Sequence, residues 1–263
     1  MRLHLRDKLR PDAPLTGMAC FSASPVLIEI MAAGGLDFVT IDMEHCPTGL
    51  ETVAHLLRAA DGGGLSPLVR VPDLDPGLIG RVLDLGADGI VLPMATVERT
   101  RAAVQAARYA PEGTRGACPA VRAAGYLPRD WAAYQREQNQ RALVVPLIED
   151  RAGLEQAEEI CAVDGADVLF LGPFDLAASL GLDGTDFRHP VLRAALDRLL
   201  AAARRHGKHV LTTMGSSVDG DYARQLLGLG VAMLSFSADV VVFAAACRRI
   251  GDLAGSLRPV PPA

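Results

Sequence analysis

The chain has 263 residues, of which half are apolar, 22% are charged and only 5% are aromatic. This length suits one large domain or two small ones, and the apolar fraction is too high for a disordered chain. The formal charge is -5 and the arginines are scattered rather than gathered into a basic stripe, so we expect no nucleic-acid partner.

The same sequence predicts a cytoplasmic protein with no membrane partner. The longest apolar stretch, residues 240–247, is far shorter than the roughly 20 residues that a membrane-spanning helix needs. The N-terminal segment lacks the apolar core of a secretory signal. The five cysteines form no CxxC pair, and an odd number of them fits reduced thiols better than a disulfide framework.

Short β-rich runs alternate with helical patterns along the chain, which is typical of a parallel α/β sheet. Several of these runs are almost continuously apolar, as in strands that helices cover on both faces. We predict eight strands, at residues 17–21, 37–42, 67–71, 89–93, 143–148, 167–171, 209–213 and 232–236.

Helix signals lie between these strands. Asp75 supplies an N-cap, Pro76 follows as a first helical residue, and Gly86 is a plausible stop after an apolar stripe. Further helices are predicted at residues 151–162, 190–206 and 218–229. Eight strand–helix units in about 250 residues predict a TIM (β/α)8 barrel. No linker or second core is visible, so residues 1–263 are expected to form a single domain.

Reactive residues of such a barrel lie just after the carboxyl ends of its strands. Glu149 and Asp175 follow two neighbouring apolar strands there. Each alone could simply cap the next helix, but two carboxylates at one mouth repel each other unless a cation lies between them. Oxygen ligands with several retained waters suit Mg²⁺, Mn²⁺ or Co²⁺, so we predict a divalent-metal site.

Two basic side chains follow the second and third strands. His45 is either a structural histidine or, beside acids at a strand end, a general base or proton relay. Arg70 either pairs with Asp42 or Glu44, or holds a carboxylate or a developing enolate. After the sixth strand, residues 172–176 have the pattern of a helix start, whose free N–H groups can hold a small carboxylate.

Six segments carry a family resemblance. They are DFVTIDMEH at 37–45, PLVRVP at 67–72, LPM at 92–94, YAPEGTRG at 109–116, LIE at 147–149 and FLGPFDL at 170–176. Together they resemble the HpcH/HpaI family of metal-dependent pyruvate aldolases, over roughly residues 15–250. The resemblance implies a phosphoenolpyruvate/pyruvate-type barrel and a reversible reaction that cleaves a 4-hydroxy-2-oxo acid. The products would be an aldehyde and pyruvate, or a close 2-oxo acid such as hydroxypyruvate.

The resemblance also implies roles for individual residues. Glu149 and Asp175 match the metal ligands, and Arg70 matches the arginine that polarises the keto oxygen. His45 matches the histidine that moves protons, and Asp42 and Asp84 match the acids that orient it. The residues that match the substrate-binding positions are Arg70, Gly172, Pro173, Phe174, Asp175 and Thr212.

The assembly implied by the resemblance is a homohexamer, a trimer of dimers whose barrels exchange their last helix, acting in carbohydrate or aromatic catabolism. Asp84 lies near the end of its helix, which runs away from the reactive face. We therefore expect Asp84 to reach the histidine of a neighbouring subunit. Departures from the family pattern at residues 117–122, Phe174 and residues 212–213 flank the expected acceptor side, so the aldehyde is not fixed.

The scarcity of lysine bears on the mechanism. Lys8 and Lys208 are the two lysines among 26 cationic residues, and neither is placed at the carboxyl end of a predicted strand. A Schiff-base aldolase needs a lysine on a barrel strand, so this composition argues against a covalent mechanism.

Two alternative functions belong to other classes. A citrate-lyase-like enzyme acting on an acyl-CoA thioester would need cations near the mouth, which Arg115, Arg122 and Arg129 of an insertion could supply. A non-catalytic binding barrel predicts a broken set of site residues, whereas every expected polar residue is present.

Overall fold

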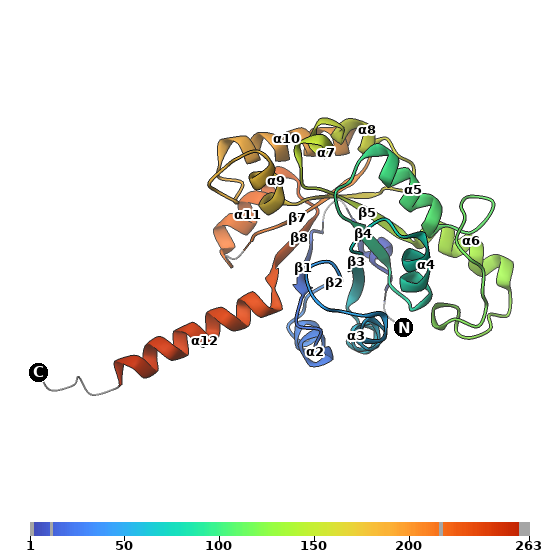
Figure 1. The fold of residues 1–263 in the computed structure, drawn as a ribbon, viewed down its shortest axis with the longest axis horizontal. Helices are drawn as coiled ribbons and strands as arrows, with labels where there is room; N and C mark the ends of the chain where they lie inside the picture. The colour runs from blue at the N-terminus through green and yellow to red at the C-terminus, as the bar shows by residue number, and fades with distance from the viewer. Residues whose placement is uncertain (1–2, 11–12, 216–217, 258–263) are drawn as a thin grey trace, which may run out of the picture.

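The computed structural model describes residues 3–10, 13–215 and 218–257. Its strands form one closed barrel in which each pairs with the next in parallel and the last pairs with the first (Figure 1). This confirms the predicted (β/α)8 barrel. The strands are β1 (Leu15–Cys20), β2 (Phe38–Asp42), β3 (Ser66–Arg70), β4 (Gly89–Leu92), β5 (Leu143–Ile148), β6 (Val168–Leu171), β7 (His209–Thr213) and β8 (Met233–Ala238).

Helices surround this barrel (Figure 1). The α-helices of the described ranges are α1 (Leu5–Lys8), α2 (Pro25–Ala33), α3 (Leu50–Gly63), α4 (Pro76–Asp84), α5 (Val97–Ala107), α6 (Trp131–Arg141), α7 (Arg151–Glu155), α8 (Ala157–Cys161), α9 (Pro173–Ser179), α10 (Pro190–Arg205), α11 (Gly220–Leu229) and α12 (Asp239–Ser256). A short 3₁₀ turn, η1 (Arg122–Ala124), precedes α6. None of the helices described is long and apolar enough to cross a membrane.

Local signals explain where several helices begin. Asp75 caps α4, because its carboxylate accepts the N–H groups of Gly77 and Leu78 at 2.8 and 3.1 Å. The single helix predicted over 151–162 is wrong: the structure has two short helices that meet at Gln156. The side chain of Gln156 accepts the N–H of Val97 at 3.1 Å, so a contact with the start of α5 holds the break in place.

The barrel interior is filled by alternate residues of the strands. Phe38, Leu68, Val145, Leu211 and Met233 are fully buried there in one apolar cluster. Side chains of a strand point alternately to its two faces, so the positions two and four residues further on share this interior face. Near the carboxyl ends the same face carries polar side chains, namely Asp42, Arg70, Glu149, Thr213, Ser235 and Ser237.

The last helix differs from the others. Figure 1 shows α12 leaving the barrel and extending away from it, and Asp239 is its one buried residue in the described chain. Phe243, Ile250 and Leu253 are more than 60% exposed. The carboxylate of Asp239 accepts the N–H of Phe21 at 2.8 Å, which ties the start of α12 to the end of β1.

Candidate active site

A cavity of about 420 Å³ opens at the carboxyl ends of the strands. Most of the predicted site residues line it, although they come from widely separated parts of the sequence. They are Asp42, His45, Arg70, Glu149, Gly172, Pro173, Phe174 and Asp175. Their position matches the face at which (β/α)8 barrels carry their reactive residues.

Glu149 is buried at the wall of this cavity, with 4% of its surface exposed. Burial raises the pKa of Glu149 to about 7, the negative charges of Glu44 and Asp175 add to this, and the N–H of Met94 opposes it. That N–H donates to Oε1 at 2.8 Å. Met94 has a φ of 50°, a left-handed conformation that is uncommon for a residue with a side chain. The backbone is therefore bent towards this carboxylate.

The donor set fits a hard divalent cation. Glu149 and Asp175 both line the cavity, and a cation between them would offset the burial and the neighbouring negative charges that raise the pKa of Glu149. In the described ranges there is no group of three or more His, Cys, Asp or Glu side chains that could hold a metal. Two carboxylates completed by waters and substrate oxygens suit Mg²⁺ or Mn²⁺, whereas a structural zinc site needs four protein ligands.

Gly172 lies where the chain passes close to Glu149. A Cβ added to Gly172 would lie 3.0 Å from Leu147 Cδ1 and 3.2 Å from Glu149 Cβ, which is tighter than ordinary packing. Glycine therefore lets the start of α9 approach the end of β5. This approach places Pro173, Phe174 and Asp175 in the lining of the same cavity as Glu149.

Arg70 is held by two acids. Its Nε donates to Asp42, and its Nη1 lies 3.0 Å from Glu44 Oε2. The arginine side chain is 12% exposed and lies 5.8 Å from the centre of the Phe21 ring. A planar guanidinium fixed in this way is preorganised to stabilise negative charge at one place in the cavity. Arg70 therefore does both things that the sequence offered as alternatives: it pairs with Asp42 and Glu44, and it lines the cavity.

His45 is attached through both its backbone and its ring. Its backbone N–H donates to Asp42 Oδ1 at 2.7 Å, and its Nε2 lies 3.6 Å from Glu44 Oε2. The ring is 58% exposed, so it stands at the rim of the cavity. Glu44 contacts both Arg70 and His45, yet the sequence suggested it only as an ion-pair partner. Its position two residues after Asp42 was the feature of the sequence that could have singled it out.

One predicted substrate contact is not found. Thr212 is fully buried outside the cavity lining, and its hydroxyl donates to the carbonyl of Leu171 at 2.8 Å. Leu211 faces the barrel interior, so strand alternation turns Thr212 outward and brings Thr213 into the cavity. Ser235 and Ser237 of β8 also line the cavity and were not singled out in the sequence.

Asp84 is not brought to His45 of its own chain. It ends α4, and its Oδ1 lies 2.6 Å from Nη2 of Arg115. The Arg115 side chain is fully buried, with its guanidinium 4.6 Å from the centre of the Tyr109 ring. The insertion (residues 115–140) therefore packs against α4, and residues 117–122 are not among the described residues that line the cavity of their own chain.

The two lysines lie away from the cavity. Lys8 Nζ donates to the carbonyl of Asp37 at 2.9 Å, just before β2, and Lys208 Nζ lies 3.3 Å from Asp167 Oδ1, just before β6. Both contacts are at the amino ends of strands, and neither lysine lines the cavity. The structure thus supports the expectation of a non-covalent mechanism.

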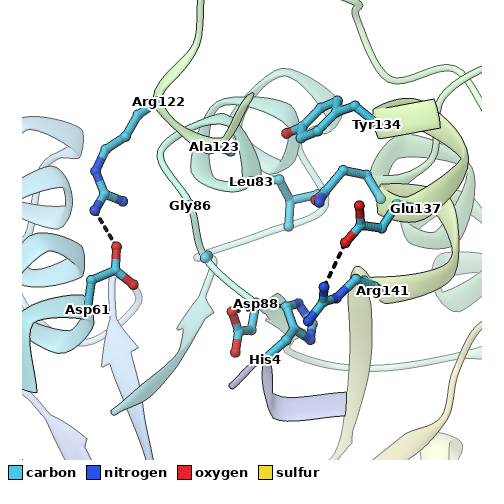
Figure 2. Close-up of a pocket in the computed structure, with 12 residues that line it drawn as sticks. His4, Asp61, Leu83, Gly86, Asp88, Arg122, Ala123, Tyr134, Glu137 and Arg141 are labelled. Atoms are coloured by element: carbon cyan, nitrogen blue, oxygen red, sulfur yellow. Dashed lines mark hydrogen bonds and ion pairs between the residues drawn. The ribbon is translucent and has the colours of Figure 1, made fainter. Parts of the chain in front are cut away.

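A second cavity, of about 570 Å³, lies beside the amino end of β4 (Figure 2). Its charged side chains are paired with one another. Arg122 pairs with Asp61, Arg141 lies 2.7 Å from Glu137, and His4 Nε2 lies 3.6 Å from Asp88. Arg115 and Arg122, which an acyl-CoA site would need at the mouth, are thus engaged elsewhere.

The closed barrel with acids, an arginine and a histidine at its carboxyl mouth is the arrangement of a (β/α)8-barrel enzyme. The model of the HpcH/HpaI aldolase/citrate lyase family matches residues 16–246, and the chain belongs to this family. The chain is 33% identical over 237 residues to a 5-keto-4-deoxy-D-glucarate aldolase of Klebsiella pneumoniae, with 90% of each protein covered.

Two solved structures show the same similarity. The HpcH/HpaI aldolase of Desulfitobacterium hafniense DCB-2 has a TM-score of 0.91 and 28% identity, over 99% of this chain and 100% of that one. The citrate synthase SbnG has a TM-score of 0.83 and 28% identity, over 97% of this chain and 100% of the other. The family is therefore one of aldolases and related carbon–carbon bond enzymes, and membership does not fix the substrate.

Proposed function

We propose that the protein is a divalent-metal-dependent pyruvate aldolase. It cleaves a 4-hydroxy-2-oxo acid to an aldehyde and pyruvate, or a close 2-oxo acid such as hydroxypyruvate. The observation that carries the proposal is the meeting of Glu149, Asp175, Arg70 and His45 in one cavity. The relative named as an aldolase supports this reaction class.

The reaction balances without an oxidant or reductant. In the cleavage direction the C3–C4 bond breaks, the C4 hydroxyl loses its proton as it becomes the aldehyde carbonyl, and C3 gains a proton. A divalent ion held by Glu149 and Asp175 supplies Lewis acidity towards the carbonyl of the 2-oxo acid. Phe174 and Asp175 line the cavity at the start of α9, where backbone N–H groups without a helical partner could hold the carboxylate.

Arg70 stabilises the negative charge that develops on the 2-oxo oxygen as the C3–C4 bond breaks. Asp42 and Glu44 hold the guanidinium in a single orientation, so no reorganisation is needed during the reaction. His45, at the exposed rim, accepts the proton of the C4 hydroxyl in cleavage and returns it in addition. Glu44 Oε2 lies 3.6 Å from its Nε2 and helps to hold the ring at the rim.

We further propose that the protein is a homohexamer whose subunits exchange α12, and that each active site is shared between two subunits. Two observations support it: α12 carries exposed apolar residues away from its own barrel, and Asp84 remains 25% exposed while it is held by the fully buried Arg115. An acid fixed at the surface in this way can contact the His45 of a neighbouring subunit.

Exchange of the C3 protons of free pyruvate in D₂O tests the proposal. We expect rapid exchange in the presence of Mn²⁺ and none after the metal is removed. An acyl-CoA lyase or a binding barrel does not exchange free pyruvate, so the absence of exchange with Mn²⁺ would overturn the proposed function in favour of one of these.

A further inference from the structure

The cavity is larger than a three-carbon acid requires. Its volume of about 420 Å³ falls in the range of about 300–1,000 Å³ that holds drug-sized ligands. The groups proposed to hold pyruvate follow β5 and β6. Arg70 ends β3 and His45 follows β2, so the rest of the lining comes from the carboxyl ends of β7, β8 and β1.

The side of the cavity at β8 and β1 is largely apolar. We call it the acceptor wall and define it as Phe21, Ser237, Ala238 and Val241, all of which line the cavity. The wall is fixed, because Asp239 accepts the N–H of Phe21 at 2.8 Å and joins the two strand ends. Phe174, 46% exposed, extends the apolar lining at the rim.

The described lining residues of this chain include no second arginine or lysine that could pair with another carboxylate. Arg70 is the one arginine or lysine among the described lining residues, and two acids already bind it. Asp42, Glu149 and Asp175 make the lining acidic. A carboxylate placed against the acceptor wall would be desolvated without a counter-charge, which is strongly unfavourable.

One polar group of the acceptor wall lacks a partner. Ser237 is 4% exposed, and its hydroxyl oxygen is buried with no hydrogen-bond partner in the described structure. Buried hydroxyls are nearly always hydrogen-bonded, so an unpartnered hydroxyl that lines a cavity indicates a ligand atom opposite it. Ser235 of the same strand also lines the cavity, but Ser237 has the hydroxyl that lacks a partner in the described structure, so it is the donor available to orient an oxygen atom of the ligand.

We propose that the acceptor is an uncharged aldehyde with an apolar chain, which lies against the acceptor wall with Ser237 donating to its oxygen. This inference rests on the proposed function. In the addition step, C3 of pyruvate loses a proton and bonds to the aldehyde carbon, and the aldehyde oxygen gains a proton. Such an acceptor differs from the acidic fragment expected from a glucarate-derived substrate, as named for the Klebsiella relative.

The test compares two aldehydes with the same four-carbon chain, butanal and succinic semialdehyde, which differ by one carboxylate. The Mn²⁺-loaded enzyme is supplied with pyruvate, and kcat/KM is measured for each aldehyde. We expect butanal to be favoured by about 10-fold or more, the factor that 1.4 kcal/mol produces. Equal values, or a preference for succinic semialdehyde, would overturn the inference.

Variants locate the effect on the acceptor wall. Val241→Lys supplies a cation there and should move the preference about 10-fold towards succinic semialdehyde. Val191→Lys is the matched control, because Val191 is exposed on α10 outside the cavity, and it should leave the preference unchanged. A folded Val241→Lys enzyme with the wild-type preference would contradict the inference.

Ser237 is tested separately. Ser237→Ala should weaken butanal addition more than it weakens pyruvate exchange, and Ser237→Thr, which keeps a hydroxyl, should restore part of the addition rate. Equal losses in both reactions would remove Ser237 from the inference. If wild-type enzyme exchanges no pyruvate protons, the proposed function fails instead, so the two failures are distinguishable.

Discussion

Two of the cavities in the described structure differ in how their charges are balanced. In the larger one, at about 570 Å³, Arg122, Arg141 and His4 each face an acid of their own chain (Figure 2). In the smaller one, at about 420 Å³, three acids, one arginine and one histidine line the space, and burial together with neighbouring carboxylates raises the pKa of Glu149 to about 7.

The functional site is thus distinguished by an excess of negative charge in its lining, and not by its size. Side chains that satisfy one another have no need of a ligand, so the larger cavity is explained by the stability of the fold. Carboxylates that repel one another need an ion or a substrate between them. Changes at the smaller cavity should therefore affect the reaction strongly, and changes at the larger one should not.

Removal of the metal should have the largest effect. EDTA should abolish both pyruvate exchange and aldol cleavage, because Glu149 and Asp175 then repel each other and the Lewis acid is lost. Mn²⁺, Co²⁺ or Mg²⁺ should restore both reactions. The control is borohydride added with pyruvate: irreversible inactivation would reveal an imine and contradict the non-covalent mechanism.

The shared site predicts complementation between two inactive proteins. His45→Ala should lose roughly 10²–10⁴ in rate, the usual contribution of general acid–base catalysis. Mixing it with Asp84→Asn under subunit exchange should restore activity, because one shared site then carries both lesions and another carries neither. If exchange of subunits is demonstrated and no activity returns, Asp84 does not act in a neighbouring subunit.

Arg70→Lys should be impaired by roughly 10²–10³ in kcat, because one preorganised donor is lost although the charge remains. Steady-state kinetics of cleavage and the rate of pyruvate exchange measure the effect. Near wild-type rates in both assays would assign Arg70 to the structural pair with Asp42.

Arg122→Gln, in the larger cavity, should have the smallest effect. Its pair with Asp61 is partly exposed, so its loss should lower the free energy of unfolding by about 1 kcal/mol or less. Urea denaturation measures this change. Pyruvate exchange should remain at the wild-type rate; a large loss of exchange would mean that the larger cavity contributes to the reaction.

The fold was largely predictable because its signals are local. Short β-rich runs, several of them almost continuously apolar, predicted the eight strands, and Asp75 with Pro76 predicted the start of α4. The break at Gln156 was not predictable, since it depends on a hydrogen bond to Val97, far away in the sequence.

The site was predictable where it depends on strand ends and less so elsewhere. Glu149 was predictable because it comes directly after an apolar strand, where a (β/α)8 barrel carries its reactive residues. Thr212 was named because it matches a family position, but its hydroxyl bonds to β6 and Thr213, one position further on the strand, lines the cavity. The pairing of Asp84 with Arg115 required knowledge of where the insertion packs, which no local pattern in the sequence provides.

The most direct test of the central claim measures pyruvate C3 exchange in D₂O on wild-type enzyme and on Glu149→Gln and Asp175→Asn, each with saturating Mn²⁺. Both substitutions keep the shape of the side chain and remove its charge. We expect the wild-type enzyme to exchange the C3 protons of pyruvate in the presence of Mn²⁺ and both variants to have lost this exchange. Wild-type exchange in either folded variant would contradict the claim that these two carboxylates carry the function.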